Sequence, residues 1–516
     1  PQRTMNVKGL DAFGAKSFPG VLWADKPGIK SVRKFRLRNG SNDWASAHLR
    51  DQLSQKASAD GPNLVASATS VAMFINGKYY GLMDLREREE ETIPSSNLGI
   101  AKDFVDYIYD PLLGAQEVKN GVNALSGYQA MHNFVTGNDM TVAANYTRAK
   151  TLLNPESLAW DWALHMFHAN YDWPGRNVHV WRSPEVDGRW TGRAHDMDFA
   201  FGRYTGVGHN MNGSFGAAGS QVINSLLRNS EFRNLYLNTV ADQLNVMTPS
   251  AMGATLDSMA AEMRPYIADY YAKNGLGPAS NWEARLGELR NWFNQREPIY
   301  DGHNRTQFGL GARQPLTVAV NDLAMGSVKV NQIATQAYMS AASPSWSGRY
   351  YPGIPVTLVE TGQPALDRGM ASIQRNYAGT MAKGKLTQAE ADARMARITP
   401  TLELAGVAAA DAGGLHPAVG SQVGGAEGEA LHARAGGGDR LSRPALQYRR
   451  GGPALCRRAG GGLPHRAVPR FGRPDQPGRG PQCAVAPAVP HHRPGDARCP
   501  RQPPQHHAVL GMVGNQ

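Results

Sequence analysis

The sequence predicts an α+β fold of two lobes, in which strands dominate the first lobe and helices the second. Residues 5–87 show the alternating apolar and polar pattern of strands, broken by glycine-containing turns and one helical stretch. Residues 100–296 carry mainly the periodicity of helices. Residues 165–202 interrupt that pattern and concentrate Asp and Asn around a short apolar run. The chemistry of the chain is therefore expected where the helical lobe is interrupted.

The first lobe is expected in the order strand, turn, strand, strand, helix, strand, strand and charged link. These elements lie, in that order, in residues 6–18 (two strands around a turn), 32–39, 45–57 (the helix), 69–75, 78–85 and 85–90. Asp43 is a plausible cap for the helix, because its carboxylate can accept hydrogen bonds from first-turn amides. Asn76-Gly77 predicts a tight hairpin between the last two strands.

Two helical patterns of the second lobe have recognisable ends. Residues 155–170 begin with Pro-Glu and place apolar residues at helical spacing, so their aromatic side chains are expected in the core. Residues 281–298 form an amphipathic pattern that is expected to end at Pro298.

Acidic and amide side chains suggest a metal site in the interrupted stretch. Asn177 follows Asp172 by five positions, and Asp196 and Asp198 follow an apolar strand pattern. Neighbouring carboxylates repel unless a cation or a proton separates them, and oxygen ligands suit Mg²⁺ or Mn²⁺. The order Asp-x₄-Asn, strand, Asp-Phe is that of the catalytic loop and metal-binding acid of protein kinases. A solvated turn, with Asn177 following Pro174-Gly175, explains the same spacing without a metal.

The element order of the first lobe also matches a kinase small lobe, which makes the expected fold divergent and protein-kinase-like. In such lobes a base on the third strand pairs with the phosphates, and the link after the sheet meets the adenine. This order predicts a nucleotide site that contains Arg36 or Arg38 on the strand, Arg50 on the helix and Glu87 in the link. The alternative for each is an ordinary surface charge.

Two other functions remain open at this point. His165 and His168 lie three positions apart on the expected helix and close to Asp172, which suits a metal-dependent hydrolase. The competing interpretation is that both histidines are packing residues of the core. A third possibility is a scaffold of a coat or surface that has no catalytic activity.

Four separated motifs make a family resemblance specific. Residues 35–53, 71–88, 171–177 and 195–202 (FRLRNGSNDWASAHLRDQL, VAMFINGKYYGLMDLRER, YDWPGRN and HDMDFAFG) together resemble the CotH kinase family. The resemblance covers about residues 5–300 and implies a bacterial, secreted-type kinase that transfers phosphate from ATP, with Mg²⁺ or Mn²⁺, to Ser of spore-coat or cell-surface proteins.

Carried over residue by residue, the resemblance implies a catalytic Asp172 and a metal-binding set of Asn177, Asp196 and Asp198. The chain departs from the family in two ways: no Lys stands at the third-strand position unless Arg36 or Arg38 replaces it, and the first strand is short. The kinase domain is expected to span residues 1–302, with the small lobe at about 1–90 and the large lobe at about 91–302.

The remaining chain is expected to be composite. Residues 305–357 predict a small all-β module. Residues 358–413 resemble part of the NAD-binding domain of 3-hydroxyacyl-CoA dehydrogenases, with a strand that ends at Glu360 and then a helix. NAD binding is not expected, because the glycine-rich phosphate loop that should precede the strand is absent. This join is interpreted as a fusion of two unrelated coding regions.

Residues 414–516 differ in composition from the rest of the chain. They contain fourteen Arg, no Lys and only five acidic residues, so most of the net charge of +11 lies there. A disordered basic tail, an RNA-binding arm and a frameshifted segment all fit, and the frameshift is favoured; disorder is expected in each case. The charge is therefore no argument for a nucleic-acid partner of the body.

Cysteine usage and hydropathy limit the compartment only weakly. All three cysteines (Cys456, Cys483 and Cys499) lie in this tail, so the body has no disulfide framework or thiolate metal site. No stretch is apolar enough for a membrane span. The chain begins without Met or a signal peptide, and it is interpreted as a fragment of an exported protein.

Overall fold

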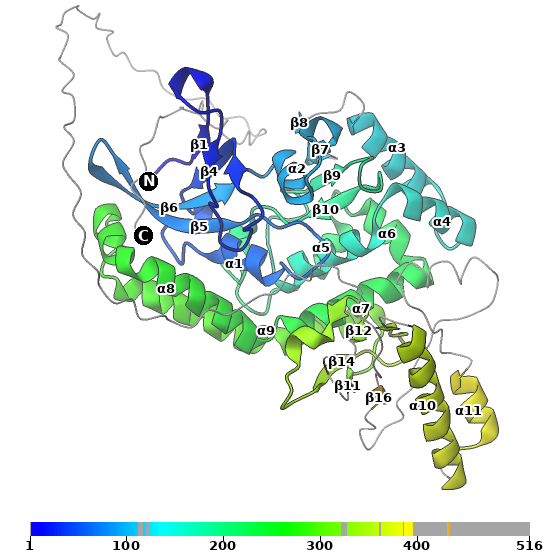
Figure 1. Cartoon of the computed structure of the whole chain (residues 1–516). Coiled ribbons are helices and arrows are strands. Elements are labelled where there is room, and N and C mark those ends of the chain that lie inside the picture. Colours follow the sequence, from blue (N-terminus) through cyan, green and yellow to red (C-terminus); the bar gives the residue numbers. More distant parts are fainter. Residues whose placement is uncertain are drawn as a thin grey trace, which may run out of the picture. The chain divides into compact units, whose positions relative to one another are not determined.

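The computed structural model describes most of the first 395 residues as a mixed helix and strand fold (Figure 1). The described residues are 2–111, 117–119, 124–320, 323, 328–360, 363–384, 386–395 and 431–433. The expected α+β class is thereby confirmed. The expectation of disorder for residues 414–516 lies outside the described residues, apart from a short strand, β16 (Leu431–Ala433).

The first lobe is built on a four-stranded antiparallel sheet in the order β1-β4-β6-β5. Its strands are β1 (Met5–Lys8), β4 (Lys34–Arg38), β5 (Ala68–Ile75) and β6 (Lys78–Glu87), and a small pair, β2 (Phe18–Pro19) and β3 (Ser31–Val32), accompanies them. The hairpin between β5 and β6 is formed by Asn76 and Gly77, as expected. Both have positive φ (50° and 75°), which matches the twist of paired strands.

Alternation along β4 separates a core face from a charged face. Phe35 and Leu37 are buried in a cluster with Met83 and Leu85 of β6. Because successive side chains of a strand point to opposite faces, the basic residues between them face the other way. These are Lys34, Arg36 and Arg38; of the three, Arg38 contacts acidic residues of the second lobe.

Helix α1 (Arg50–Ala57) belongs to the first lobe in sequence but packs into the core of the second. Leu49, not Asp43, occupies the N-cap position, but Asp43 reaches the first turn as a cap from farther back: its Oδ2 accepts hydrogen bonds from the amides of Leu49 and Arg50 at 2.9 and 3.1 Å. The helix begins five residues later than its sequence pattern, since residues 44–49 form the turn that this cap closes.

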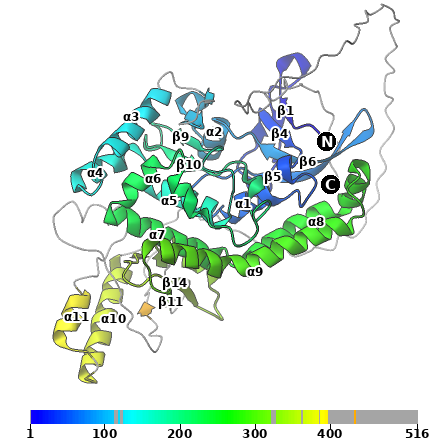
Figure 2. The same cartoon turned by 180° about the vertical axis from the view of Figure 1, so that it is seen from behind.

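Two long helices of the second lobe hold that turn. These helices, α8 (Pro249–Asn274) and α9 (Ser280–Phe308), pack against each other, and both views show α8 below the first-lobe strand β5 (Figures 1 and 2). The hydroxyls of Tyr270 and Tyr271 donate to the carbonyls of Trp44 and Ser46 at 2.8 and 2.9 Å. The indole of Trp282 donates to the carbonyl of Ala47 at 2.9 Å. The start of α1 is therefore fixed from the helical side.

The second lobe surrounds the buried helix α5 (Pro155–Phe167). Asn154 caps α5 through the amide of Ser157, and Pro155 occupies its first turn, as the Pro-Glu signal predicts. A four-stranded antiparallel sheet in the order β10-β9-β7-β8 lies beside it. The strands are β7 (Asp106–Tyr109), β8 (Glu117–Lys119), β9 (His179–Arg182) and β10 (Thr191–Arg193). The other helices are α2 (Thr92–Leu98), α3 (Ala124–Gly137), α4 (Ala143–Leu152), α6 (Gln221–Leu227) and α7 (Ser230–Val246).

The predicted end of the last helix at Pro298 is wrong. Helix α9 continues through Pro298 to Phe308. A proline removes one backbone hydrogen bond of the helix, but burial of Arg296, Tyr300 and Asn304 on its inner face stabilises the following turns. Packing in this case outweighs the local signal.

The expected β module packs on α7 and shares the core of the second lobe. Its strands are β11 (Gln314–Val320), β12 (Val328–Val330), β13 (Ile333–Ala334) and β14 (Ser345–Tyr350). Tyr350 and Asn331 donate to Asp242 Oδ1 of α7 at 2.7 and 3.2 Å. Val318 and Trp346 lie in the same apolar cluster as α5 and α7. The described part of this module is therefore continuous in packing with the lobe before it.

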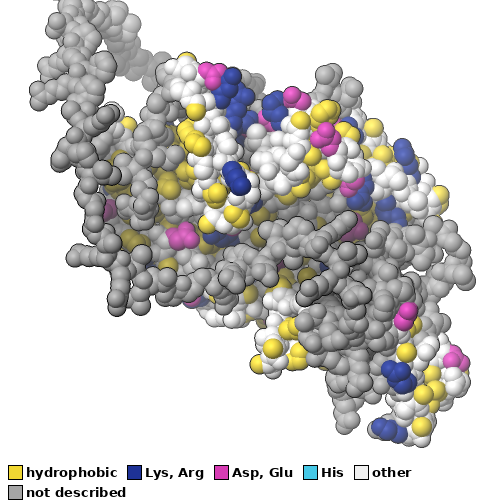
Figure 3. All heavy atoms as spheres, viewed as in Figure 1, with side chains coloured by type: hydrophobic (Ala, Val, Ile, Leu, Met, Phe, Trp, Pro, Cys, Tyr) yellow, Lys and Arg dark blue, Asp and Glu magenta, His cyan; other side chains and the backbone are white. Residues whose placement is uncertain are grey.

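The next segment forms β15 (Leu358–Glu360), α10 (Gln363–Ala382) and α11 (Gln388–Met395), in the expected order of strand and helix. Among the described residues, no helix is both long and apolar enough to cross a membrane. On the face drawn in Figure 3, acidic and basic side chains of the described residues are interspersed with apolar ones. The charge of this face is mixed in sign.

Candidate active site

The loop between α5 and β9 brings Asp172 and Asn177 together. Asn177 Nδ2 donates a hydrogen bond to Asp172 Oδ2 at 2.9 Å. Asn177 adopts a left-handed conformation with φ of 64°, which Asn tolerates better than most residues. The other carboxylate oxygen of Asp172 is buried and has no hydrogen-bond partner among the described residues. The loop therefore presents one free carboxylate oxygen.

The second acidic segment follows β10 and lies against the same loop. Asp198 belongs to a short 3₁₀ turn (Met197–Phe199), and its Oδ2 accepts from the amide of Asn42 at 2.8 Å. The amide of Phe201 donates to the carbonyl of His168 at 2.7 Å, which ties the two segments to each other. The stretch with Asp172 and the stretch with Asp198, about 25 residues apart in sequence, therefore lie next to each other in the fold.

The three carboxyl groups influence one another electrostatically. Burial, reinforced by the charge of Asp196, raises the pKa of Asp172 to about 7. Burial and the same Asp196 charge raise the pKa of Asp198 to about 8. A carboxyl group with such a pKa is readily neutralised by a proton or by a cation.

Arg38 of β4 supplies the cation of this surface. Its Nη2 contacts Asp196 Oδ1 and lies 3.5 Å from Asp198 Oδ2, and its Nη1 donates to Asp51 Oδ2 of α1 at 2.6 Å. A strand base paired with a helix acid is the arrangement that positions phosphates in protein kinases. Of the two arginines considered from sequence, Arg38 is the one in contact with the acidic pair.

The other three residues of the expected nucleotide site lie elsewhere. Arg36 donates to Asn6 at 3.2 Å from the same strand face. Arg50 is buried against its cap, Asp43. Glu87 is buried and binds Lys26 and the amide of Ser67. Asp51, the neighbour of Arg50 on the same helix, was not assigned to the site, yet it is the helix acid that Arg38 contacts.

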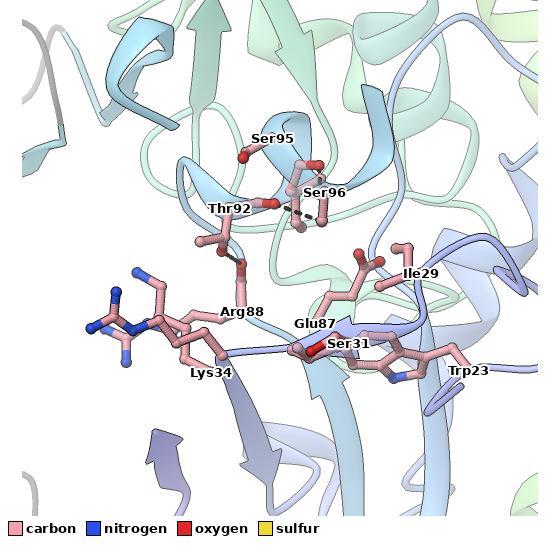
Figure 4. Close-up of a pocket in the computed structure, with 12 residues that line it drawn as sticks. Trp23, Ile29, Ser31, Lys34, Glu87, Arg88, Thr92, Ser95 and Ser96 are labelled. Atoms are coloured by element: carbon pink, nitrogen blue, oxygen red, sulfur yellow. Dashed lines mark hydrogen bonds between the residues drawn. The ribbon is translucent and has the colours of Figure 1, made fainter. Parts of the chain in front are cut away.

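Glu87 borders a small pocket on the outer side of the link (Figure 4). The pocket has a volume of about 100 Å³, with Trp23 and Ile29 on its apolar side. Lys34 reaches its rim and is paired with Glu90 and Glu91. The pocket does not include Arg38 or the acidic pair.

The carboxylate oxygens of the candidate site suit a hard cation, although they do not converge on one point in this structure. Buried oxygens of Asp172 and Asp198 lack hydrogen-bond partners within the described chain. No three His, Cys, Asp or Glu side chains of the described residues converge as a preformed metal cluster. Arg38 contacts both Asp196 and Asp198 and offsets part of their charge.

His165 and His168 are core residues in this structure. His165 stacks on Trp173 with ring centroids 4.2 Å apart, and its Nδ1 lies 3.1 Å from Asn170 Nδ2. His168 packs against Phe201, and burial lowers its pKa to about 3. These contacts match the packing interpretation of the two histidines.

Sequence reasoning missed Glu89, Arg86, Arg193 and His195, which extend the charged network behind Arg38. The run 85–90 was interpreted as a charged link, and Glu87 was the residue of it that was assigned to the nucleotide site. The alternation of basic and acidic side chains in this run was the available signal. The partner of Glu89 on β10, Arg193, is however more than 100 residues away in sequence.

Comparison with known families identifies two segments of the chain. A family model described as CotH kinase protein matches residues 6–300, which include both acidic segments, Arg38 and α1. A model described as the NAD binding domain of 3-hydroxyacyl-CoA dehydrogenase matches residues 349–412. No curated protein matches the chain.

Proposed function

The chain belongs to the CotH kinase family, and we propose from this that it is a protein serine kinase that uses ATP with Mg²⁺ or Mn²⁺. The proposed substrates are Ser residues of exported proteins, at the cell surface or in a spore coat. The observation that carries the proposal is the contact of Arg38 with Asp51 on one side and with Asp196 and Asp198 on the other. This contact places Arg38, the proposed phosphate-binding base, next to Asp196 and Asp198, a pair of acids that suits a metal ion.

Asp172 is the proposed base for the acceptor. The Ser hydroxyl oxygen forms a bond to the γ-phosphorus while the bond between that phosphorus and the ADP oxygen breaks, and the hydroxyl proton moves to Asp172. The raised pKa of Asp172, about 7, suits a group that must accept a proton near neutral pH. Asn177 holds Asp172 in place through its 2.9 Å hydrogen bond.

The charged side chains of the candidate site are proposed to orient the phosphates. Asn177, Asp196 and Asp198 are the proposed holders of Mg²⁺ or Mn²⁺, which when bound neutralises phosphate charge. Arg38 reaches the same place from the first lobe and is the proposed partner of the phosphate oxygens. Arg36 is the next base along the same strand face and is the second candidate.

The test is labelled-phosphate transfer from ATP by the full chain, with Mg²⁺ or Mn²⁺ and a mixture of Ser peptides. Wild type is expected to label the peptides, and Asp172→Asn is expected to remain folded and to lose transfer. Asp187→Asn, an exposed carboxylate of the β9–β10 turn, is the matched control and should keep it. Peptides with Ser replaced by Ala should accept no label. A folded wild type that labels nothing, or an equally active Asp172→Asn, would contradict the proposal.

A further inference from the structure

Glu89 lies in the link between the lobes and is joined to both. Only 1 % of its surface is exposed. Its Oε1 accepts from Arg86 Nη2 of β6 at 3.2 Å and from Arg193 Nη2 of β10 at 3.3 Å. Its Oε2 lies 3.0 Å from His195 Nδ1, which follows β10. One carboxylate therefore bridges the first-lobe sheet and the second-lobe sheet.

One branch from Glu89 reaches the acidic pair through the first lobe. Arg86 contacts Asp51 Oδ2, the same oxygen that Arg38 holds. Asp51 Oδ1 accepts a hydrogen bond at 3.0 Å from the amide of Met197, the residue between the two metal-binding aspartates. Burial acts to raise the pKa of Asp51, but Arg86 and Arg38 hold it far below its usual range. Through these hydrogen bonds Asp51 positions both Arg38 and the backbone of the acidic segment.

The second branch reaches the acidic pair directly along the chain. His195 immediately precedes Asp196 and stacks on His179 of β9, with ring centroids 3.7 Å apart. Arg193 Nη1 donates to the hydroxyl of Tyr107 at 3.3 Å on β7. The chain that enters the acidic segment is thus held by Glu89 on one side and by the second-lobe sheet on the other.

A buried network of charged side chains lowers the stability of the fold unless each charge keeps its partner. Removal of one member of a buried ion network leaves the others unpaired inside the protein. Partners behind a metal ligand also set its orientation, and their loss commonly weakens metal binding. Glu89 is the described carboxylate that belongs to both branches.

We propose that Glu89 is a positioning residue that holds Asp196 and Asp198 in the geometry for binding a divalent cation. It acts through Arg86 and Asp51 on one branch and through His195 on the other. The inference rests on the proposed function only in taking Asp196 and Asp198 as the metal-binding acids.

The test is calorimetric titration of the full chain with Mn²⁺, in the absence of nucleotide. Glu89→Gln is expected to weaken Mn²⁺ binding about 10- to 100-fold. Glu90→Gln is the matched control, because Glu90 is adjacent, 2 % exposed and ion-paired to Lys34 and Arg88, yet has no contact with the acidic segment. The control is expected to stay within about threefold of wild type, below the range typical for residues behind a metal ligand. An unchanged Glu89→Gln, or an equal loss in both variants, would overturn the inference.

A second pair of variants keeps the test decisive if Glu89→Gln does not fold. Glu89→Asp retains the charge but shortens the side chain, so it should weaken Mn²⁺ binding about tenfold while Glu90→Asp does not. Equal affinities for these two would also overturn the inference. In phosphate transfer, Glu89→Asp should lower kcat and leave KM for the Ser peptide unchanged.

The outcomes also separate the two proposals. A wild type that binds Mn²⁺ but transfers no phosphate contradicts the proposed function, and the Glu89 comparison then still decides the positioning role. A wild type that binds no Mn²⁺ contradicts both.

Discussion

Arg38 Nη1 donates to Asp51 Oδ2 at 2.6 Å, and this contact joins a strand of the first lobe to a helix that packs with the second. The same guanidinium group contacts Asp196 and Asp198 through its other nitrogen. A planar guanidinium with several donors can hold carboxylates on two sides, which a single ammonium group cannot do in the same geometry.

Arg38→Lys should therefore keep the charge and lose much of the activity. We expect kcat/KM for ATP to fall about 100-fold, which corresponds to about 2.7 kcal/mol of lost transition-state stabilisation. Arg33→Gln, an exposed charge at the start of the same strand, is the control and should change the rate little. Steady-state kinetics with varied ATP checks the prediction, and equal rates for Arg38→Lys and wild type would contradict it.

His168→Leu should leave Mn²⁺ binding unchanged. Neither ring nitrogen of His168 has a hydrogen-bond partner among the described residues, and such a buried polar group costs about 1–3 kcal/mol. The variant is therefore expected to be as stable as wild type or more stable by about 1 kcal/mol. Calorimetric titration with Mn²⁺ and thermal unfolding check both points. Loss of Mn²⁺ binding would revive the interpretation of His165, His168 and Asp172 as a hydrolytic centre.

Asp242→Asn should remove a pH dependence of stability. Burial raises the pKa of Asp242 to about 7, so the folded protein retains a proton that the unfolded chain loses near pH 4. The unfolding free energy of the wild type must then fall as pH rises from about 4 to about 7, and it levels off above pH 7. Asp242 contributes at most about 4 kcal/mol to this fall. Asn has no charge to bury, so the variant should be the more stable protein at pH 8.

Urea unfolding of both proteins at pH 4.5 and pH 8 measures this effect. Other groups titrate in both proteins, so the decisive quantity is the difference in unfolding free energy between the two at each pH. Asp187→Asn serves as an exposed control. A difference that is the same at both pH values would show that Asp242 is ionised in the folded protein throughout.

A chain that ends at residue 302 should be much less stable than one that ends at residue 357. The shorter chain cuts α9 before its last turns and exposes the face of α7 that binds Tyr350 and Asn331. Loss of the buried Val318 and Trp346 also removes buried apolar surface, each Å² of which stabilises the fold by about 25 cal/mol. Thermal unfolding of the two truncated proteins checks the prediction, and equal midpoints would show that the β module folds independently.

Local signals predicted the elements well, while pairings across the lobes could not be predicted. Asp43 and Asn76-Gly77 act within a few residues of themselves, so sequence identified the cap and the hairpin. The acids at 172 and 196–198 could be proposed from sequence because each cluster is compact in sequence.

The partners of Glu89 are a different case. Arg193 is 104 positions from Glu89 and becomes its neighbour only when the two sheets pack. A charged run such as 85–90 predicts exposure on average, and its burial depends on cations that come from another part of the chain. The continuation of α9 past Pro298 likewise depends on packing that no local pattern records.

The three hydrogen bonds from Tyr270, Tyr271 and Trp282 onto residues 44–47 limit how often α1 can leave its place. Each buried hydrogen bond contributes about 1 kcal/mol net, so breaking all three costs about 3 kcal/mol. At equilibrium a displaced α1 would then be populated in fewer than about one molecule in a hundred. The helix that carries Asp51 is thus in place in nearly every molecule before any ligand arrives.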